Sequence, residues 1–464
     1  MKHLVILLVA VTPMFLWGQI PQSSEVELAL QRIIQDEGLK HGTVGFLAVN
    51  LDNGRVLAEH NSSKSMTPAS IQKLITTGCA IEQLGPDFQF ETEVYSSGEG
   101  VNGVLKGNIV VVGSGDPTLE SRYNAAKASE QFNSLLTGVD KIDGQVIIDA
   151  SHFTKHTTPR GWIWEDMGNY FGASPSAFMW KDNMLKVVLR SGQVGSKAML
   201  AKPYPNVDIE IEVTAAEGNK DDAWFFGSPQ NEIIYAKGTI PAHKASFPVK
   251  AAHPFPENRF VRETFPAKTP ASISYTTYDL NGYQKFGSIK SPSLAEIAKQ
   301  TNTHSINLYA EALNIELDKS AHNKSVEGGI ASIEAYAKGK RVSTKGTRFI
   351  DGSGLSPLNR TTAQFMVDFL GAMYRSEHYK VFYASMPIGG QTGTLKYYFK
   401  DSKATGNLRA KSGTMQGVRN YAGYVTNKYD ETIAFCLLLN DYDADRRTAI
   451  MKQLENLVVG MIED

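Results

Sequence analysis

The spacing of apolar residues changes along the chain and predicts where strands give way to helices. The apolar run 44–50, an Asp-Asn-Gly turn and a second short run over 55–60 predict a β-hairpin. Over 71–84, apolar side chains recur three and four residues apart, until a Gly-Pro pair ends the pattern. This spacing predicts a largely buried helix that opens near residue 70.

Residues 88–283 carry a different pattern. Short β-type runs, such as 145–148 and 207–213, alternate with turns rich in Gly, Asn and Asp. We interpret the segment as a β-rich insertion of one or two subdomains. Its aromatic-rich stretch, 162–180, suits either a sugar-stacking surface or a small core beneath the insertion, and we favour the core.

Helical spacing returns in the last third of the chain, over 294–300 and 308–317. Two predicted strands, 419–426 and 432–439, follow, and an amphipathic helix over 444–461 ends the chain. The apolar stripe of that helix is most simply a face packed on a sheet, with a role at a membrane surface as the alternative.

The N-terminal segment has the features of a secretory signal. Lys2 precedes an apolar run over 4–17, and polar residues follow Gly18 and Gln19. The run is too short to cross a membrane comfortably. We expect residues 1–19 to be a cleaved signal peptide, so that the mature chain is periplasmic or otherwise extracytoplasmic and has no transmembrane anchor. An uncleaved N-terminal anchor is the alternative.

Composition narrows the choice of partners and cofactors. The 47 basic and 48 acidic residues are spread along the chain, which argues against nucleic acid as a partner. The two cysteines, Cys79 and Cys436, lie in apolar stretches typical of core residues, and a disulfide between them is the alternative. No H-E-x-x-H or P-loop motif occurs, and the G-x-G-x-x-G match at 98–103 leads into a strand. The sequence therefore implies no metal and no cofactor.

The segment Ser70-Ile71-Gln72-Lys73 is the one Ser-x-x-Lys of the chain. A spacing of three residues places the hydroxyl and the amine on one helix face, one turn apart. A helix N-terminus favours negative charge, which suits a serine nucleophile with a lysine base. The lysine pKa of about 10.4 must be lowered for that role by burial or by neighbouring cations. Alone, such a motif is more often a solvated helix start.

Two further motifs accompany it. The tripeptide Ser305–Asn307 precedes a predicted helix, and residues 411–414 (Lys-Ser-Gly-Thr) lie on a predicted strand. There, the lysine is a second cation, Ser412 is a hydroxyl donor and Gly413 allows close approach of the backbone. Each motif is weak by itself. Their order, each occurring once, is the combination of penicillin-recognising serine enzymes.

With these motifs, the chain resembles the D-alanyl-D-alanine carboxypeptidases/endopeptidases of the penicillin-binding protein 4 type, peptidase family S13. More than 200 residues separate Ser70 from Ser305, and members of that family carry inserted domains in this place. Segments 113–119 (GSGDPTL), 161–166 (GWIWED) and 351–356 (DGSGLS) look like further signatures of the family. Many relatives have Thr at the position of Ser412. Because the hydroxyl is retained, we expect tuning of activity and not loss.

The resemblance implies a role for each member of the first two motifs. Ser70 would attack the carbonyl between two D-alanines and form an acyl-enzyme, while Lys73 takes its proton. Ser305 would relay a proton toward the leaving amine. Asn307 would hold the substrate amide and Lys73.

The resemblance also implies the substrate-binding residues. Lys411 and Ser412 would bind the terminal carboxylate, beside Gly413. The backbone N–H groups of Ser70 and Thr414 would form an oxyanion hole. For one more residue, Ser353, two interpretations stay open: a substrate contact near the cleft, or a turn residue between two glycines.

The implied fold is α+β, with a β-lactamase/transpeptidase-like domain of one antiparallel sheet flanked by helices and a large β-rich insertion. The domain would be assembled from residues 20–87 and 284–464, and the insertion would comprise 88–283.

The leading hypothesis is a secreted serine DD-peptidase that cuts D-Ala-D-Ala bonds, and also D-Ala crosslinks, of peptidoglycan stem peptides. Stem peptides and β-lactam antibiotics are the expected partners. Two alternatives stay open: a serine β-lactamase or esterase of the same fold, and a non-catalytic module that binds peptidoglycan.

Overall fold

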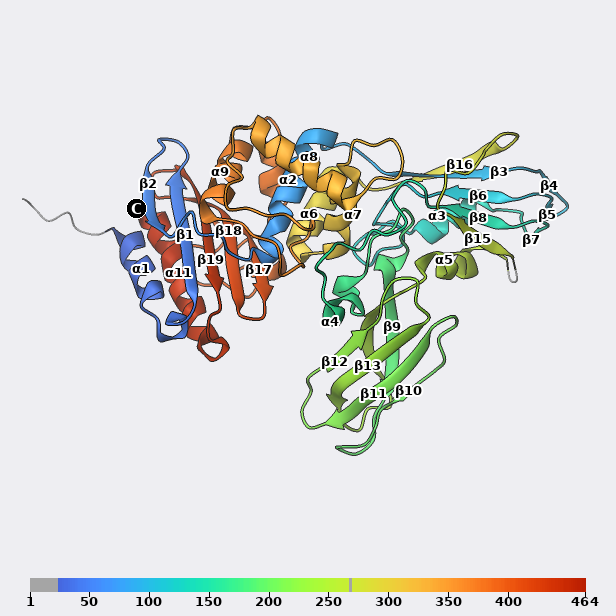
Figure 1. Ribbon diagram of the computed structural model, residues 1–464, viewed down its shortest axis with the longest axis horizontal. Helices are drawn as coiled ribbons and strands as arrows, with labels where there is room; N and C mark the ends of the chain where they lie inside the picture. The colour runs from blue at the N-terminus through green and yellow to red at the C-terminus, as the bar shows by residue number, and fades with distance from the viewer. Residues whose placement is uncertain (1–23, 267–268) are drawn as a thin grey trace, which may run out of the picture.

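The structure is a computed structural model that describes residues 24–266 and 269–464. The expected signal peptide, residues 1–19, lies outside the described residues. Figure 1 shows that the two ends of the chain, blue and red, build one lobe, whereas the middle of the chain, cyan to yellow-green, builds the other. Within the described residues, no helix is both long and apolar enough to cross a membrane.

The lobe built from the two chain ends contains an antiparallel sheet in the order β17-β18-β19-β1-β2. Its strands are β1 (Thr43–Asn50), β2 (Val56–His60), β17 (Arg409–Met415), β18 (Val418–Thr426) and β19 (Thr432–Asn440). β1 pairs with β19 along its whole length, from Thr43 opposite Asn440 to Asn50 opposite Ile433. The N-terminal hairpin and the C-terminal strands therefore form one sheet. Helices cover both of its faces, so β18 and β19 are buried almost throughout.

The two terminal helices, α1 (Glu25–Ile34) and α11 (Arg447–Glu463), cover one face of this sheet and pack on each other (Figure 1). Leu454 and Leu457 of α11 lie in one buried cluster with Phe46 of β1. The apolar stripe predicted near the C-terminus is therefore a face packed on a sheet.

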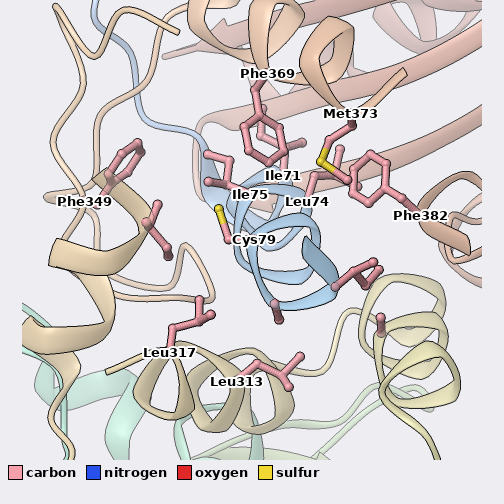
Figure 2. Packing of buried hydrophobic residues seen from close by; sticks show 14 of the residues in the cluster. Ile71, Leu74, Ile75, Cys79, Leu313, Leu317, Phe349, Phe369, Met373 and Phe382 are labelled. Carbon is pink, nitrogen blue, oxygen red and sulfur yellow. The ribbon is translucent and has the colours of Figure 1, made fainter. Parts of the chain in front are cut away.

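The opposite face carries the helices around α2 (Gln72–Leu84), which is buried from Gln72 to Ile81. The others are α6 (Leu294–His304), α7 (Asn307–Glu316), α8 (Val326–Gly339), α9 (Ala363–Tyr374) and α10 (Tyr379–Ala384). Figure 2 shows Cys79 of α2 in this core, with Phe369 and Phe382 nearby. Cys79 and Cys436 are both free and buried there, as the core interpretation predicts.

The middle of the chain folds into sheets of its own, which makes the insertion β-rich as predicted. The first sheet has the order β15-β8-β6-β3-β16, and the others are β10-β9-β14, β11-β13-β12 and β4-β5-β7. The elements are β3 (Glu91–Ser96), β4 (Gly100–Val101), β5 (Val104–Leu105), β6 (Ile109–Val112), α3 (Ala128–Leu135), β7 (Lys141–Ile142), β8 (Val146–Asp149), α4 (Trp164–Met167), β9 (Met184–Arg190), β10 (Met199–Leu200), β11 (Asp208–Ala216), β12 (Asp222–Phe226), β13 (Ile233–Pro241), β14 (Phe247–Ala252), α5 (Pro256–Thr264), β15 (Ala271–Ser274) and β16 (Gln284–Lys290).

The strand β16 begins directly after the domain boundary that the sequence predicted between residues 283 and 284. It pairs antiparallel with β3, with Lys290 opposite Glu91, so it shares the first sheet of the insertion. The chain returns to the other lobe only afterwards, where the amide of Ser291 donates to the Phe90 carbonyl at 2.9 Å. This edge strand is largely exposed and polar, so it lacks the apolar run by which strands are found in a sequence.

Two side-chain contacts join the insertion to the helices around α2. The indole of Trp162 donates to a carboxylate oxygen of Asp351 at 2.9 Å. The amide nitrogen of Asn307 donates to the main-chain carbonyl of Phe171 at 2.8 Å. Because Asn307 belongs to a candidate motif, the insertion forms one wall of the candidate site.

Candidate active site

Ser70 lies in a short 3-10 turn, Ala69–Ile71, that leads directly into α2. Ala69 has a positive φ of 46°, a conformation that costs energy in a residue with a Cβ. Ser70 is partly exposed at the end of the helix, whereas Lys73, one turn later, is fully buried. The Nζ atom of Lys73 lies 2.9 Å from the Oγ atom of Ser70.

Three oxygen atoms surround the Lys73 amine. It donates to Oδ1 of Asn307 and to the main-chain carbonyl of Ser353, both at 2.6 Å, and the third oxygen is Ser70 Oγ. The amide oxygen and the carbonyl can only accept, whereas the hydroxyl can also donate. A neutral amine has two N–H groups for the two acceptors and one lone pair for the Ser70 proton. The geometry therefore suits a base that activates Ser70.

The electrostatics of Lys73 agree with this geometry. Burial lowers its pKa to about 7, because the charged form is deprived of water. The carboxyls of Asp351 and Glu311 act in the opposite sense and raise the pKa. Near neutral pH, a large fraction of the amine is therefore neutral, which is the form that a base requires.

Glu311, on α7, is a buried acid that the sequence analysis did not single out. Its carboxylate accepts from the amides of Gly352 and Ser353, at 2.9 and 2.8 Å. Burial, together with the charge of Asp351, raises the pKa of Glu311 to about 8. Glu311 thus holds the main-chain segment whose carbonyl accepts the hydrogen bond of Lys73.

Asp351 holds the same loop from the other side. It accepts from the amides of Gly354 and Ser356, at 2.7 and 2.6 Å, and from the Trp162 indole. These bonds turn the loop so that the carbonyl of Ser353, and not its hydroxyl, contacts Lys73. Ser353 is fully buried, and its hydroxyl accepts a hydrogen bond from the amide of Leu355 at 3.3 Å.

Ser305 and Asn307 lie at the junction of α6 and α7. Ser305 ends α6 in the left-handed conformation, with φ of 58°, and Asn307 begins α7. Ser305 Oγ accepts from Lys411 Nζ at 2.9 Å, while Asn307 Oδ1 accepts from Lys73. Because Asn307 Nδ2 donates to the carbonyl of Phe171, both ends of this amide are bound and its orientation is determined.

Lys411, on β17, is the second buried lysine of the site. Its Nζ donates to Ser305 Oγ and, at 2.7 Å, to the carbonyl of Ser412. Burial and the charges of Lys73 and Arg419 lower its pKa well below the usual value. Among the described residues, no carboxylate offsets these effects. A bound anion, such as a carboxylate of a ligand, would supply the missing partner.

Residues 412–414 carry β17 past the turn of Ser70. Ser412 Oγ donates to the hydroxyl of Thr394 at 2.9 Å. A Cβ at Gly413 would lie 2.6 Å from the Pro68 carbonyl and 3.1 Å from the Ser70 nitrogen, so a side chain here would push the strand away. This close approach brings the main chain before Thr414 next to Ser70, which an oxyanion hole made from their two N–H groups requires.

The structure thus brings Ser70, Lys73, Ser305, Asn307 and Lys411 together from three distant parts of the chain. Glu311 left a signal in the sequence, since it is a lone acid in the apolar stretch 308–315, four residues after Asn307. Thr394 left none, because its contact with Ser412 is purely tertiary. Within the described residues, no group of three or more His, Cys, Asp or Glu could hold a metal ion.

The fold is that of a penicillin-binding protein. The crystal structure of penicillin binding protein 4 (dacB) from Haemophilus influenzae superposes on this structure with a TM-score of 0.80 at 24% sequence identity. The superposition covers 94% of this chain and 99% of the Haemophilus influenzae chain. The sheet made from both chain ends and the insertion within it are thus parts of a known architecture.

Sequence comparison defines the family. The model of the D-Ala-D-Ala carboxypeptidase 3 (S13) family matches residues 26–459. D-alanyl-D-alanine carboxypeptidase DacB of Haemophilus influenzae is 27% identical over 427 residues, 86% of this chain and 85% of that protein. D-alanyl-D-alanine carboxypeptidase of an Actinomadura species is 27% identical over 471 residues, 94% and 86% of the two chains. The chain belongs to the S13 family of serine-type D-Ala-D-Ala carboxypeptidases, as the resemblance indicated.

Proposed function

We propose that this protein is a secreted DD-peptidase that hydrolyses the terminal D-Ala-D-Ala bond of peptidoglycan stem peptides through an acyl-enzyme on Ser70. One observation carries the proposal: Ser70 Oγ lies 2.9 Å from the buried amine of Lys73, whose pKa is about 7. D-Ala crosslinks, whose scissile bond is chemically similar, are further substrates. The carboxypeptidase names of the relatives, and a Haemophilus influenzae structure complexed with a β-lactam, support the proposal.

Acylation begins when Lys73 takes the proton of Ser70 and Oγ bonds to the carbonyl carbon between the two D-alanines. The N–H groups of Ser70 and Thr414 stabilise the negative charge that forms on the carbonyl oxygen. Ser305 passes a proton to the nitrogen of the leaving D-alanine as the C–N bond breaks, and Lys73 returns to Ser305 the proton that it took from Ser70. Lys411, bonded to Ser305 Oγ, orients that hydroxyl.

Lys411 and Ser412 bind the carboxylate of the leaving D-alanine, because Lys411 has no acidic partner in the described part of the chain. Asn307 holds Lys73 against Ser70 and lies beside the substrate backbone. Water then attacks the acyl-enzyme, or an amine does, and Ser70 is released. A β-lactam enters the same route and leaves an acyl group on Ser70.

The intact mass of the mature protein, measured after incubation with benzylpenicillin, tests this proposal beside a Ser70→Ala control. We expect one adduct per chain on the wild type and none on the variant. Release of D-alanine from a pentapeptide stem then establishes the peptidase activity.

Two other outcomes would overturn the proposal. Consumption of penicillin without an adduct and without D-alanine release would identify a β-lactamase. An unmodified protein with unchanged penicillin, which still binds stem peptides after Ser70→Ala, would identify a non-catalytic binding module.

A further inference from the structure

A row of aromatic rings lies on the surface of the insertion. Trp164 of α4 is 46% exposed and Trp224 of β12 is 45% exposed. The row is not part of the small core that the sequence suggested for the stretch 162–180: Trp162 and Trp180 of that stretch are buried, whereas Trp164 is not. The stretch therefore supplies both a core and an exposed face.

The rings of this row lie in two pairs. The Trp164 ring lies 6.3 Å from that of Phe226, and the Trp224 ring lies 6.1 Å from that of Phe171. Trp224 and Phe226 are two residues apart on β12, so their side chains leave the strand on the same face. We call Trp164, Phe226, Trp224 and Phe171 the aromatic row.

One end of the aromatic row lies at the candidate active site. The main-chain carbonyl of Phe171, at this end, accepts a hydrogen bond from Asn307, and Asn307 in turn accepts one from Lys73. At its other end, Trp164 follows two residues after Trp162, whose indole is bonded to Asp351 of the loop behind Lys73. The main chain of Phe171 and the residue Trp162, two positions before Trp164, are thus bonded to residues around Ser70. Figure 1 shows α4 and β12 on the side of the insertion that is turned toward the sheet of the other lobe.

We infer that the aromatic row binds sugar rings of the glycan strand to which the stem peptide is attached. This inference rests on the proposed function and names a second part of the same substrate. The apolar C–H face of a pyranose stacks on an indole or phenyl ring, while its hydroxyl groups stay in water at the edge. Two pairs of rings along one face of a strand suit a polymer of linked sugars. Exposed apolar surface of this kind, continuous with a catalytic site, is typical of a ligand-binding surface.

Two substrates that share one peptide test the inference: a free pentapeptide ending in D-Ala-D-Ala, and the same peptide on its N-acetylated disaccharide. Trp164→Ala and Trp224→Ala are each compared with the wild type. We expect kcat/KM to fall roughly tenfold on the disaccharide substrate, as loss of one aromatic anchor would cause, and to stay unchanged on the free peptide.

Tyr429→Ala is the matched control, because Tyr429 is an aromatic residue that is 64% exposed in the β18–β19 turn. This substitution should change kcat/KM on neither substrate. The rate of benzylpenicillin acylation, measured on every variant, reports whether the catalytic lobe is intact. A second measurement follows the tryptophan fluorescence of the Ser70→Ala protein during titration with peptide-free glycan strands, and we expect a change that Trp164→Ala reduces.

The outcomes separate this inference from the proposed function. If the tryptophan variants matched the wild type in kcat/KM on both substrates, the inference would be overturned. It would also be overturned if kcat/KM fell equally on both substrates while penicillin acylation stayed normal. Either outcome would leave the proposed peptidase activity standing. Binding of a protein at the row, with no effect of glycan strands, would also overturn it. An absence of D-alanine release from either substrate by the wild type would overturn the proposed function itself.

Discussion

The two Ser–Lys pairs of the site have the same geometry and opposite surroundings. Ser70 and Lys73 are 2.9 Å apart, as are Ser305 and Lys411, and both amines are buried. Behind Lys73 stand two carboxyls, which raise its pKa against the effect of burial. The charged groups of the described residues that act on Lys411 are the cations Lys73 and Arg419, which lower its pKa further.

This difference separates two tasks that one residue type can perform. Lys73 has two buried carboxyl groups beside it, at positions 311 and 351, so it can lose and regain a proton while the site is empty. Lys411 has no such partner among the described residues, and a carboxylate in contact with it would raise its pKa again. Charge balance therefore suits Lys73 to the proposed role of base and Lys411 to the proposed role of anion receptor.

Removal of the base should give the largest effect. In Lys73→Ala, no amine remains to take the Ser70 proton, and we expect benzylpenicillin acylation to slow by roughly 10³-fold. Time-resolved intact mass measures the rate. Lys400→Ala, at an exposed lysine, is the control and should match the wild type. A loss of less than tenfold in Lys73→Ala would show that another group takes the proton.

Removal of the anion receptor should depend on the ligand. We expect Lys411→Ala to lose roughly 10²-fold in kcat/KM on a peptide with a free terminal carboxylate, since a buried charge pair is broken. On the methyl ester of that peptide, the loss should be only a few-fold. The comparison of the two substrates is decisive, because an equal loss on both would mean that Lys411 does not bind the carboxylate.

The pH dependence should follow the base. With a Lys73 pKa of about 7, the neutral amine predominates above that pH and the protonated, inactive amine below it. We therefore expect the acylation rate to rise about tenfold from pH 6 to pH 8. Second-order rate constants for benzylpenicillin across this range give the profile. A flat or falling profile would contradict the role of Lys73.

The loop behind Lys73 should also depend on the insertion, because Trp162 of the insertion donates a hydrogen bond to Asp351 of that loop. Trp162→Phe removes the indole N–H and leaves a buried carboxylate oxygen short of one donor, which should lower the free energy of unfolding by about 1–3 kcal/mol. Acylation should fall only a few-fold. Urea unfolding measures the stability. Trp164→Phe, at an exposed ring, is the control and should have the free energy of unfolding of the wild type. An equal loss of stability in both variants would show that the hydrogen bond between Trp162 and Asp351 does not stabilise the fold.

Local chemistry in the sequence was enough to predict much of the site. Ser70 and Lys73 are three residues apart, so the helical repeat alone places them on one face. The segment 432–439 is apolar on both faces after its first residue, so its burial within a sheet was also readable, whereas 419–426 carries Arg419 and Asn420. The order of the three motifs and the family signatures then indicated the fold and the family.

The sequence by itself therefore indicated the side chains that are proposed to carry the chemistry, and it predicted the segments that form the helix of Ser70 and the C-terminal strands. The tertiary structure alone decided how those side chains are charged and held. The pKa of Lys73 depends on burial and on carboxyls at positions 311 and 351, and the exposure of Trp164 depends on which neighbours the insertion packs against it. Periodicity reports local burial, whereas solvation and charge at a site are sums over residues that meet only in the folded chain.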